Sequence, residues 1–184
     1  ALRRRWRAKQ LLALDGKQTR LQQTVARLLA LTRPKDFWIV TNDDLRSAIA
    51  RQLPRLAGKQ ILAEPCGRNT APAIGLAAYL LLRHDPEAVL GLFPSDHVIA
   101  DEGKFQGTVR RAVEIARAGE NIGVMGVPPT SPETGYGYIE VARGPLQGGV
   151  VRVLRVTEKP DTRRRGRVGV VGKCRRKCAL IARL

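Results

Sequence analysis

The sequence predicts an α/β protein with a doubly wound, mainly parallel sheet. Helix-like and strand-like patterns alternate along the chain, as they do in connected β-α-β units. The strand candidates are short continuous apolar runs, which is typical of strands covered by helices on both faces. Polar segments follow several of these runs, at the sheet edge where open sheets of this class bind ligands.

The first predicted elements lie between residues 19 and 53. Thr19–Leu31 places its apolar residues on one helical stripe, the spacing of an amphipathic helix. Phe37–Thr41 is a continuous apolar run, so we expect a strand covered on both faces. Asp43 or Asp44 can cap the next helix, which reaches about Leu53.

The same patterns continue through the rest of the chain. Gln60–Ala63 is expected to form a weak strand. Asn69 or Thr70 caps a helix that runs through Leu82, with Pro72 in its first turn, where a missing N–H costs little. The remaining predicted elements are a buried strand over Val89–Phe93, a helix through Phe105–Ala116, a strand over Ile122–Val127, and a strand pair over Tyr138–Ala142 and Val150–Val156.

Length and composition predict one folded domain. The chain has 184 residues, and 43% of them are hydrophobic, which excludes a disordered chain by composition. No apolar stretch approaches the roughly 20 residues that cross a bilayer. We therefore expect a cytoplasmic protein.

The net charge of +17 is concentrated at the two ends of the sequence. Residues 1–9 hold five basic residues and residues 162–184 hold nine, and neither segment has an acidic one. Removing these fourteen charges from +17 leaves +3 for residues 10–161. Basic ends bind polyanions nonspecifically through counterion release, but they say little about the chemistry of the body.

Asp96 is the candidate metal ligand. It belongs to Phe93-Pro-Ser-Asp-His97, directly after a predicted strand. A carboxylate in this place suits Mg²⁺, which takes one or two protein carboxylates together with phosphate oxygens. The alternative is that Asp96 only caps the following turn.

A second polar segment, Glu64–Ile74, joins a predicted strand to a helix. Gly67 permits close approach of a ligand to the backbone, and Arg68 can contact phosphate. Asn69 and Thr70 offer donors and acceptors at the start of the helix. For each residue taken alone, ordinary helix capping is the simpler interpretation.

Two further segments follow later strands. Gly137 lies in Gly135-Tyr-Gly-Tyr138, where glycines let a flat ligand lie against the backbone. Glu158 can accept hydrogen bonds from sugar hydroxyls, and Lys159 can neutralise a phosphate. The alternatives are a turn with core tyrosines and a surface ion pair.

Taken together and in this order, these strings resemble the sugar-nucleotide pyrophosphorylases, specifically the mannose-1-phosphate guanylyltransferase branch. The similarity covers about residues 8–161. The strings that carry it are Gly67-Arg-Asn-Thr-Ala-Pro-Ala-Ile74, Phe93-Pro-Ser-Asp-His97 and Pro132-Glu-Thr-Gly-Tyr-Gly-Tyr-Ile139. Lys9-Gln10 is similar to the Pro-Lys-Gln of the family, with Ala8 in place of the proline.

The resemblance implies a Rossmann-like nucleotidyltransferase domain and a reaction. GTP and mannose 1-phosphate give GDP-mannose and pyrophosphate, with Mg²⁺ as cofactor. No specific nucleic acid or membrane partner is implied, and a homo-oligomer is compatible with the family. The implied site residues are Lys9 on phosphate, Asp96 on the metal, Glu64, Gly67, Arg68, Asn69 and Thr70 on the nucleotide, and Gly137, Glu158 and Lys159 on the sugar phosphate.

The sequence departs from the family at both ends. The glycine-rich phosphate loop and its strand, expected before Lys9, are not in the sequence, and neither is the C-terminal part of the family. We expect residues 1–161 to be a partial nucleotidyltransferase domain that lacks its first strand. Residues 162–184 are expected to be a basic tail, either solvated or, as their abrupt change in composition favours, not native domain sequence.

Two alternatives stay open from the sequence. The first is a related pyrophosphorylase that uses another sugar phosphate or nucleoside triphosphate. The second is a non-catalytic protein whose basic ends bind polyanions.

Because the phosphate loop is the main cradle for a triphosphate in this family, we expect the 184-residue chain to form little or no GDP-mannose. The measurement is product formation from GTP and mannose 1-phosphate by the purified chain. Appreciable turnover would contradict this expectation.

Overall fold

A computed structural model describes residues 8–13, 16–67, 70–129, 137–142, 144, 149–158 and 174–183. The chain divides into two compact units, one of Ala1–Gly123 with Ile181–Leu184 and one of Val124–Leu180. None of the helices in the described part is long and apolar enough to cross a membrane.

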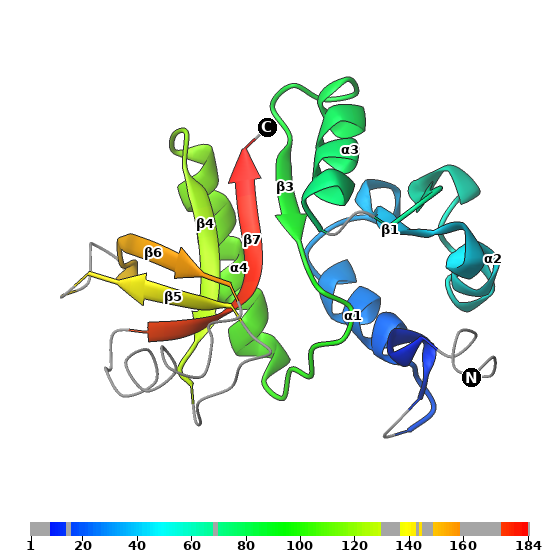
Figure 1. The fold of residues 1–184 in the computed structure, drawn as a ribbon, viewed down its shortest axis with the longest axis horizontal. Coiled ribbons are helices and arrows are strands. Elements are labelled where there is room, and N and C mark those ends of the chain that lie inside the picture. Colours follow the sequence, from blue (N-terminus) through cyan, green and yellow to red (C-terminus); the bar gives the residue numbers. More distant parts are fainter. Residues whose placement is uncertain are drawn as a thin grey trace. The chain divides into compact units, whose positions relative to one another are not determined.

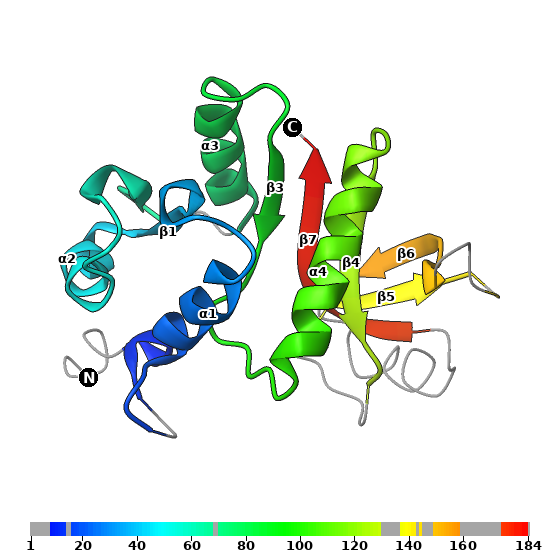
Figure 2. The ribbon, with the colours of Figure 1, turned by 180° about the vertical axis from the view of Figure 1, so that it is seen from behind.

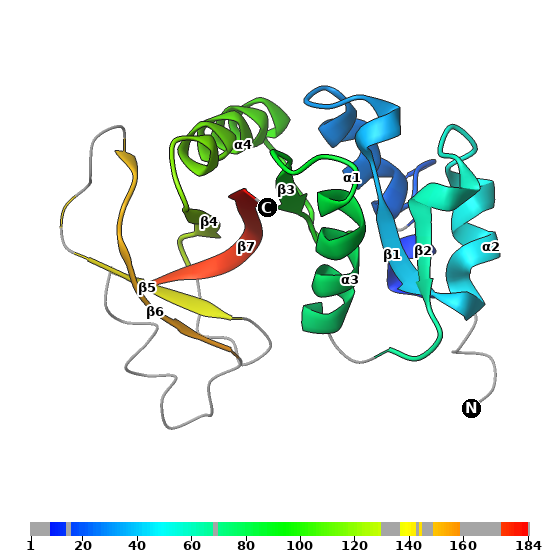
Figure 3. The same cartoon turned by 90° about the horizontal axis from the view of Figure 1, so that it is seen from above.

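The first unit begins with two helices and a two-stranded parallel sheet. Helices α1 (Arg20–Leu29) and α2 (Asp43–Gln52) alternate with strands β1 (Ile39–Asn42) and β2 (Ile61–Glu64). In the sheet, Ile39 lies opposite Ile61. Figure 3 shows β1 and β2 side by side, with α2 next to them. The buried core of this part consists of Leu21, Val25, Ile49, Leu53, Leu56 and Ile61.

Helix α1 begins where the sequence predicts. Thr19 caps it: its Oγ1 accepts from the backbone N–H of Gln22 at 3.3 Å, and the Gln22 side chain accepts from the N–H of Thr19 at 3.0 Å. This capping box satisfies two donors that have no partner inside a helix. Leu21, Val25 and Leu28 on one stripe are buried, as their spacing predicts.

The first unit continues with α3 (Thr70–Leu82), β3 (Val89–Leu92) and α4 (Glu102–Arg117). Asp101 caps α4 by accepting from the N–H of Lys104 at 2.8 Å. Figures 1 and 2 show α3 beside β3 within this unit. In the strand order, β3 is the neighbour of β7 (Cys174–Arg183), whose last residues belong to this unit.

Strand β4 (Ile122–Val127) also pairs with β7. A Cβ at Gly123, the last residue of β4 in the first unit, would lie 3.5 Å from the carbonyl oxygen of Ile181 and 3.9 Å from Cβ of Ala112. Gly123 thus packs closely against both the end of β7 and helix α4.

The second unit contains antiparallel strands. Strands β5 (Tyr138–Val141) and β6 (Val153–Thr157) pair with Tyr138 opposite Thr157, and β5 also pairs with β7. Strand β5 is mostly buried, whereas β6 is largely exposed, with 60% of Leu154 accessible to solvent. The strands therefore form two sheets rather than one: β1 and β2 make a separate parallel pair, and the β5–β6 and β5–β7 pairs, in the other sheet, are antiparallel.

The predicted elements are present, with differences at their edges. Helix α2 is capped by Asn42, whose side chain accepts from the N–H of Leu45 at 3.1 Å, so the expectation of Asp43 or Asp44 as cap is wrong. Asn42 precedes the helix and can keep the extended backbone that a cap needs. The expectation that β1 and β3 are fully covered on both faces is also wrong, because their side chains are half-buried or exposed.

Part of the predicted tail, residues 162–184, lies in the fold. Residues Cys174–Arg183 form β7, in which Ala179 and Ile181 are buried. Arg183 forms an ion pair with Glu87, in the segment before β3. A solvated state is therefore wrong for Ala179 and Ile181, which lie in a continuous apolar run at the end of the segment. That residues 162–184 are not native domain sequence stays a prediction.

Gln60 anchors the entry to β2. Its amide is buried, and Gln60 belongs to the short 3-10 turn Gly58–Gln60 rather than to the predicted strand. Its Nε2 donates to the carbonyl oxygens of Pro34 at 2.7 Å and Phe37 at 2.6 Å, and its Oε1 accepts from the N–H of Ala57 at 2.8 Å. One side chain thus joins the segments that precede β1 and β2.

We predict that Gln60→Met lowers the free energy of unfolding by about 2 kcal/mol, because three backbone groups lose part-buried hydrogen bonds to Gln60 while the side-chain volume is kept. Urea denaturation measures the change, with the exposed neighbour substitution Lys59→Met as control. A loss below about 0.5 kcal/mol, the range of ordinary surface substitutions, would show that these bonds do not support the fold.

Candidate functional site

Asp96 lies in the turn that follows β3. The strand ends at Leu92, and Ser95 and Asp96 form the turn before the chain leads to α4. The Asp96 side chain is exposed. The prediction that Asp96 follows the end of a strand is therefore confirmed, while its role as a metal ligand stays a prediction.

The residues on either side of this turn are anchored. Phe93 packs edge-to-face against Phe105 of α4, with ring centroids 6.0 Å apart. The ring of Phe93 also folds back over Gly91, where a Cβ would lie 2.6 Å from Cε2 of the ring. On the other side, the carbonyl oxygen of His97 accepts from Nη2 of Arg27 at 3.2 Å. The exposed carboxylate of Asp96 thus lies on a short segment that is anchored at Phe93 and at His97.

The backbone around Lys9 lies in a 3-10 turn, Lys9–Leu11. Gln52, at the end of α2, holds this turn by donating from Nε2 to the carbonyl oxygen of Leu11 at 3.2 Å. Its Oε1 accepts from the hydroxyl of Thr19 at 2.8 Å, and its carbonyl oxygen accepts from Nε2 of Gln22 at 3.1 Å. The turn is therefore tied to the start of α1.

The predicted nucleotide residues follow β2. Glu64 ends the strand and is half-buried, Gly67 is exposed, and Thr70 is the exposed first residue of α3. Arg68 and Asn69 lie outside the described residues. Glu64 and Thr70 thus belong to a strand end and a helix start within one unit, as the sequence predicts.

The structure brings together Gly137 and Glu158. Because Tyr138 lies opposite Thr157, the residues just outside this pair also face each other. A Cβ at position 137 would lie 2.7 Å from Oε2 of Glu158 and 3.3 Å from its Cδ. Gly137 is not among the glycines with positive φ. Its lack of a side chain therefore serves to leave space for the Glu158 carboxylate. Lys159 lies outside the described residues.

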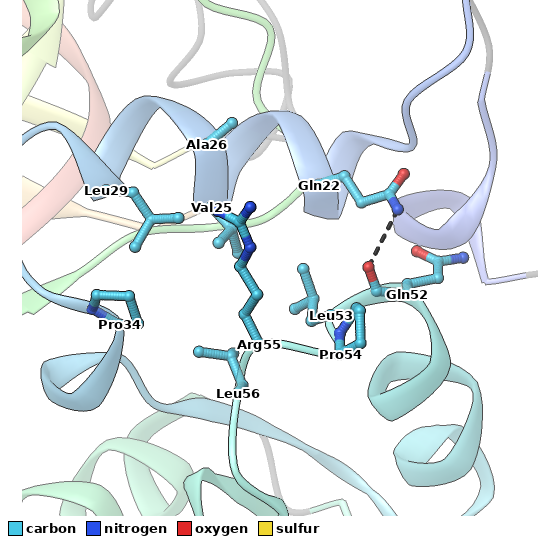
Figure 4. Close-up of a pocket in the computed structure, with 10 residues that line it drawn as sticks. All are labelled: Gln22, Val25, Ala26, Leu29, Pro34, Gln52, Leu53, Pro54, Arg55 and Leu56. Atoms are coloured by element: carbon cyan, nitrogen blue, oxygen red, sulfur yellow. Dashed lines mark hydrogen bonds between the residues drawn. The ribbon is translucent and has the colours of Figure 1, made fainter.

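A pocket of about 220 Å³ lies elsewhere in the first unit (Figure 4). Its lining is mostly apolar and comes from α1, Pro34 and the segment that ends α2, with the side chains of Gln22, Gln52 and Arg55 as polar groups. None of the predicted site residues lines this pocket. It is therefore a separate feature of the α1–α2 core.

The site residues occur in both units. Asp96, Glu64 and Thr70 belong to the first unit, and Gly137 and Glu158 to the second. Among the described residues, no group of three or more His, Cys, Asp or Glu side chains could hold a metal ion. A divalent ion bound through one protein carboxylate and nucleotide phosphates needs no such group.

Sequence reasoning missed the residues that support these segments, above all Arg27 and Gln52. Both lie on helices and look like ordinary polar positions. The sequence carried no clear signal for Arg27, because a residue next to Leu28 lies about 100° away around the helix, off the apolar stripe. Only the structure shows that this charged residue is buried and makes specific contacts.

Comparison with known proteins identifies the relatives of this chain. A family model described as nucleotidyl transferase matches residues 4–173. The chain is 42% identical over 166 residues to the alginate biosynthesis protein AlgA of Pseudomonas aeruginosa, covering 89% of this chain and 34% of that protein. It is 41% identical over 160 residues to a mannose-1-phosphate guanylyltransferase of Escherichia coli, covering 83% and 33%. The chain thus spans about a third of the length of these curated relatives.

Two solved structures have a similar fold. A mannose-1-phosphate geranyltransferase from Thermus thermophilus matches with a TM-score of 0.83 and 29% identity, over 97% of this chain and 51% of that one. A mannose-6-phosphate isomerase from Helicobacter pylori matches with a TM-score of 0.83 and 25% identity, over 98% and 67%. These likenesses confirm the predicted α/β nucleotidyltransferase fold.

We predict that Gly137→Ala displaces the Glu158 carboxylate and that the cost depends on this carboxylate. Thermal unfolding of a double-mutant cycle measures this. Gly137→Ala should lower the free energy of unfolding by about 1 kcal/mol when Glu158 is present, and by close to nothing in a Glu158→Ala background. Equal costs in both backgrounds would show that the two groups do not interact.

Proposed function

We propose that this chain, which belongs to the nucleotidyl transferase family, carries a site that transfers a guanylyl group from GTP to mannose 1-phosphate. We propose that it acts in the cytoplasm. A phosphate oxygen of the sugar phosphate attacks the α-phosphorus of GTP and forms a new P–O bond. The bond from this phosphorus to the bridging oxygen breaks, and pyrophosphate leaves with the electron pair. GDP-mannose is the product. Positioning of the two substrates and neutralisation of charge carry such a reaction.

The observation that carries this proposal is the contact between Gly137 and the Glu158 carboxylate. Two residues that the family resemblance assigns to one ligand, the sugar phosphate, lie against each other although 21 positions separate them. A carboxylate can accept from two neighbouring sugar hydroxyls, and the lack of a side chain at position 137 leaves room for this carboxylate. Lys159 would neutralise the phosphate of this substrate.

Asp96 fits the role of a metal ligand for Mg²⁺. It is an exposed carboxylate on a turn whose two sides are anchored, so it can meet an ion that arrives with the nucleotide. When bound, Mg²⁺ neutralises charge on the phosphates and the leaving pyrophosphate. Asp96 itself would orient the ion.

The nucleotide would be held by the segment after β2 and by the turn before α1. Glu64, Gly67, Arg68, Asn69 and Thr70 would line the guanosine side, since amide, hydroxyl and carboxylate groups there can read a polar base. Lys9 would contact phosphate, and Gln52 would keep its backbone in place. We propose GTP rather than another triphosphate on the basis of the strings shared with the guanylyltransferase branch.

Polyanion binding is the second candidate, and the observation that favours it is the charge of +17. It predicts salt-sensitive binding to heparin that survives Asp96→Ala. Because β7 lies in the basic segment, charge neutralisation at Arg163, Arg164, Arg165 and Arg167 tests it better than removal of residues 162–184. Heparin binding unaffected by this neutralisation would count against the candidate.

We predict that calorimetric titration with MgCl₂ present detects tighter binding of GTP than of ATP, UTP or dTTP.

In the same measurement, Glu158→Gln should weaken the binding of mannose 1-phosphate about tenfold and leave the binding of GTP unchanged, because a charge-assisted hydrogen bond contributes about 1.5–3 kcal/mol. Glu140→Gln, an exposed carboxylate on β5, is the matched control. A preference for another triphosphate would favour a related pyrophosphorylase, and unchanged sugar-phosphate binding in Glu158→Gln would contradict the assignment of Glu158.

A further inference from the structure

Arg27 is a buried cation at the end of α1. Only 4% of the residue is exposed, although arginine is rarely buried so deeply. Its Nη2 donates to Oγ1 of Thr24 at 2.8 Å and to the carbonyl oxygen of His97 at 3.2 Å. This nitrogen carries two hydrogens, so one serves its own helix and the other serves a segment 70 residues further along the chain.

Helix α4 also contacts Arg27. The carbon Cζ of Arg27 lies 5.9 Å from the centre of the Phe105 ring, within range of a cation–π contact. The same ring receives Phe93 edge-to-face at 6.0 Å. Gln106 donates from Nε2 to the carbonyl oxygen of Arg27 at 3.0 Å, which fixes the backbone of this turn of α1.

These contacts bracket Asp96. Phe93 precedes the Ser95–Asp96 turn and rests on Phe105, and His97 follows it and accepts from Arg27. Phe105 therefore touches both the residue that anchors the start of the segment and the cation that anchors its end. The exposed carboxylate projects from a short stretch of backbone whose two ends are fixed by one cluster.

The energetics explain why an arginine would be kept in this place. Removing a guanidinium from water costs several kcal/mol unless its donors meet acceptors. A hydrogen bond from a charged donor contributes about 1.5–3 kcal/mol, so the His97 carbonyl is held in a narrow range of positions. An apolar side chain of similar size could fill the space, but it would leave this carbonyl free to move.

We propose that Arg27 is a positioning residue for Asp96: by binding the His97 carbonyl, it holds the Asp96 carboxylate in the orientation that receives a divalent cation. The inference rests on the metal role of Asp96 in the proposed function. Partners in the outer shell of a metal ligand typically affect metal affinity by about 10–100-fold, because a loose ligand must be ordered when the ion binds.

The test uses Mn²⁺ as the probe and the full 184-residue chain with GTP. Arg27→Met keeps the volume and removes the donors, and Arg27→Lys keeps the charge without the planar fork. Val25→Ala is the control, because Val25 is buried in the same helix but packs into the cluster with Leu53 and Ile61. Electron paramagnetic resonance of free Mn²⁺ measures half-saturation, and hydrogen exchange measures the mobility of the His97 and Val98 amides.

We expect both Arg27→Met and Asp96→Asn to raise the Mn²⁺ concentration at half-saturation about tenfold. In Arg27→Met, exchange of the His97 and Val98 amides should also become faster, because this segment loses an anchor. For Arg27→Lys, the Mn²⁺ concentration at half-saturation and the rate of amide exchange should lie between those of Arg27→Met and of the unsubstituted chain. Val25→Ala should lower the melting temperature and leave both readouts unchanged. This combination separates positioning from a loss of stability alone.

Two other results would contradict the proposal or the function on which it rests. If Asp96→Asn weakens Mn²⁺ while Arg27→Met behaves as Val25→Ala does, the positioning role is wrong and the proposed function stands. If Asp96→Asn leaves Mn²⁺ half-saturation unchanged, the metal role in the proposed function is wrong. Amide exchange in Arg27→Met then still decides whether Arg27 holds the His97 segment.

Discussion

The hydrogen bond from the buried Arg27 guanidinium to the His97 carbonyl is the constraint on which the candidate metal segment depends. It joins the first helix of the chain to the connection after β3, and it uses a charge that would be costly to bury without such an acceptor. Each end of helix α1 is therefore bonded to a segment of the candidate site. Its start is tied through Thr19 and Gln52 to the turn that holds Lys9, and its end is tied to the segment that presents Asp96.

Two glycines serve the candidate site in the same physical way. Gly91 leaves room for the ring of Phe93, and Gly137 leaves room for the carboxylate of Glu158. In both places a Cβ would come within 3.0 Å of the neighbouring side chain, and neither glycine has positive φ. Close approach, rather than an unusual backbone conformation, is the reason for a residue without a side chain. Each glycine thus lets a side chain from the end of a strand fold back over the sheet.

The sequence predicted the helices and strands well because their signals are local: the stripe of α1 and the apolar runs of β3 and β4 each lie within one element. It also predicted which polar residues follow strand ends. It could not predict Arg27 with His97, or Gln52 with Leu11, because these bonds join residues far apart in sequence. The position of β7 was missed for the same reason, since strand pairing there overrides a basic composition.

Paramagnetic broadening by Mn²⁺ tests most directly whether the turn after β3 receives the metal. In an amide NMR spectrum of the chain with GTP, small additions of Mn²⁺ should first remove the signals of Ser95, Asp96 and His97, whereas Mg²⁺ should not broaden them. Broadening that begins at other carboxylates, such as Asp43 and Asp44 at the start of α2, while residues 95–97 stay sharp, would contradict the account.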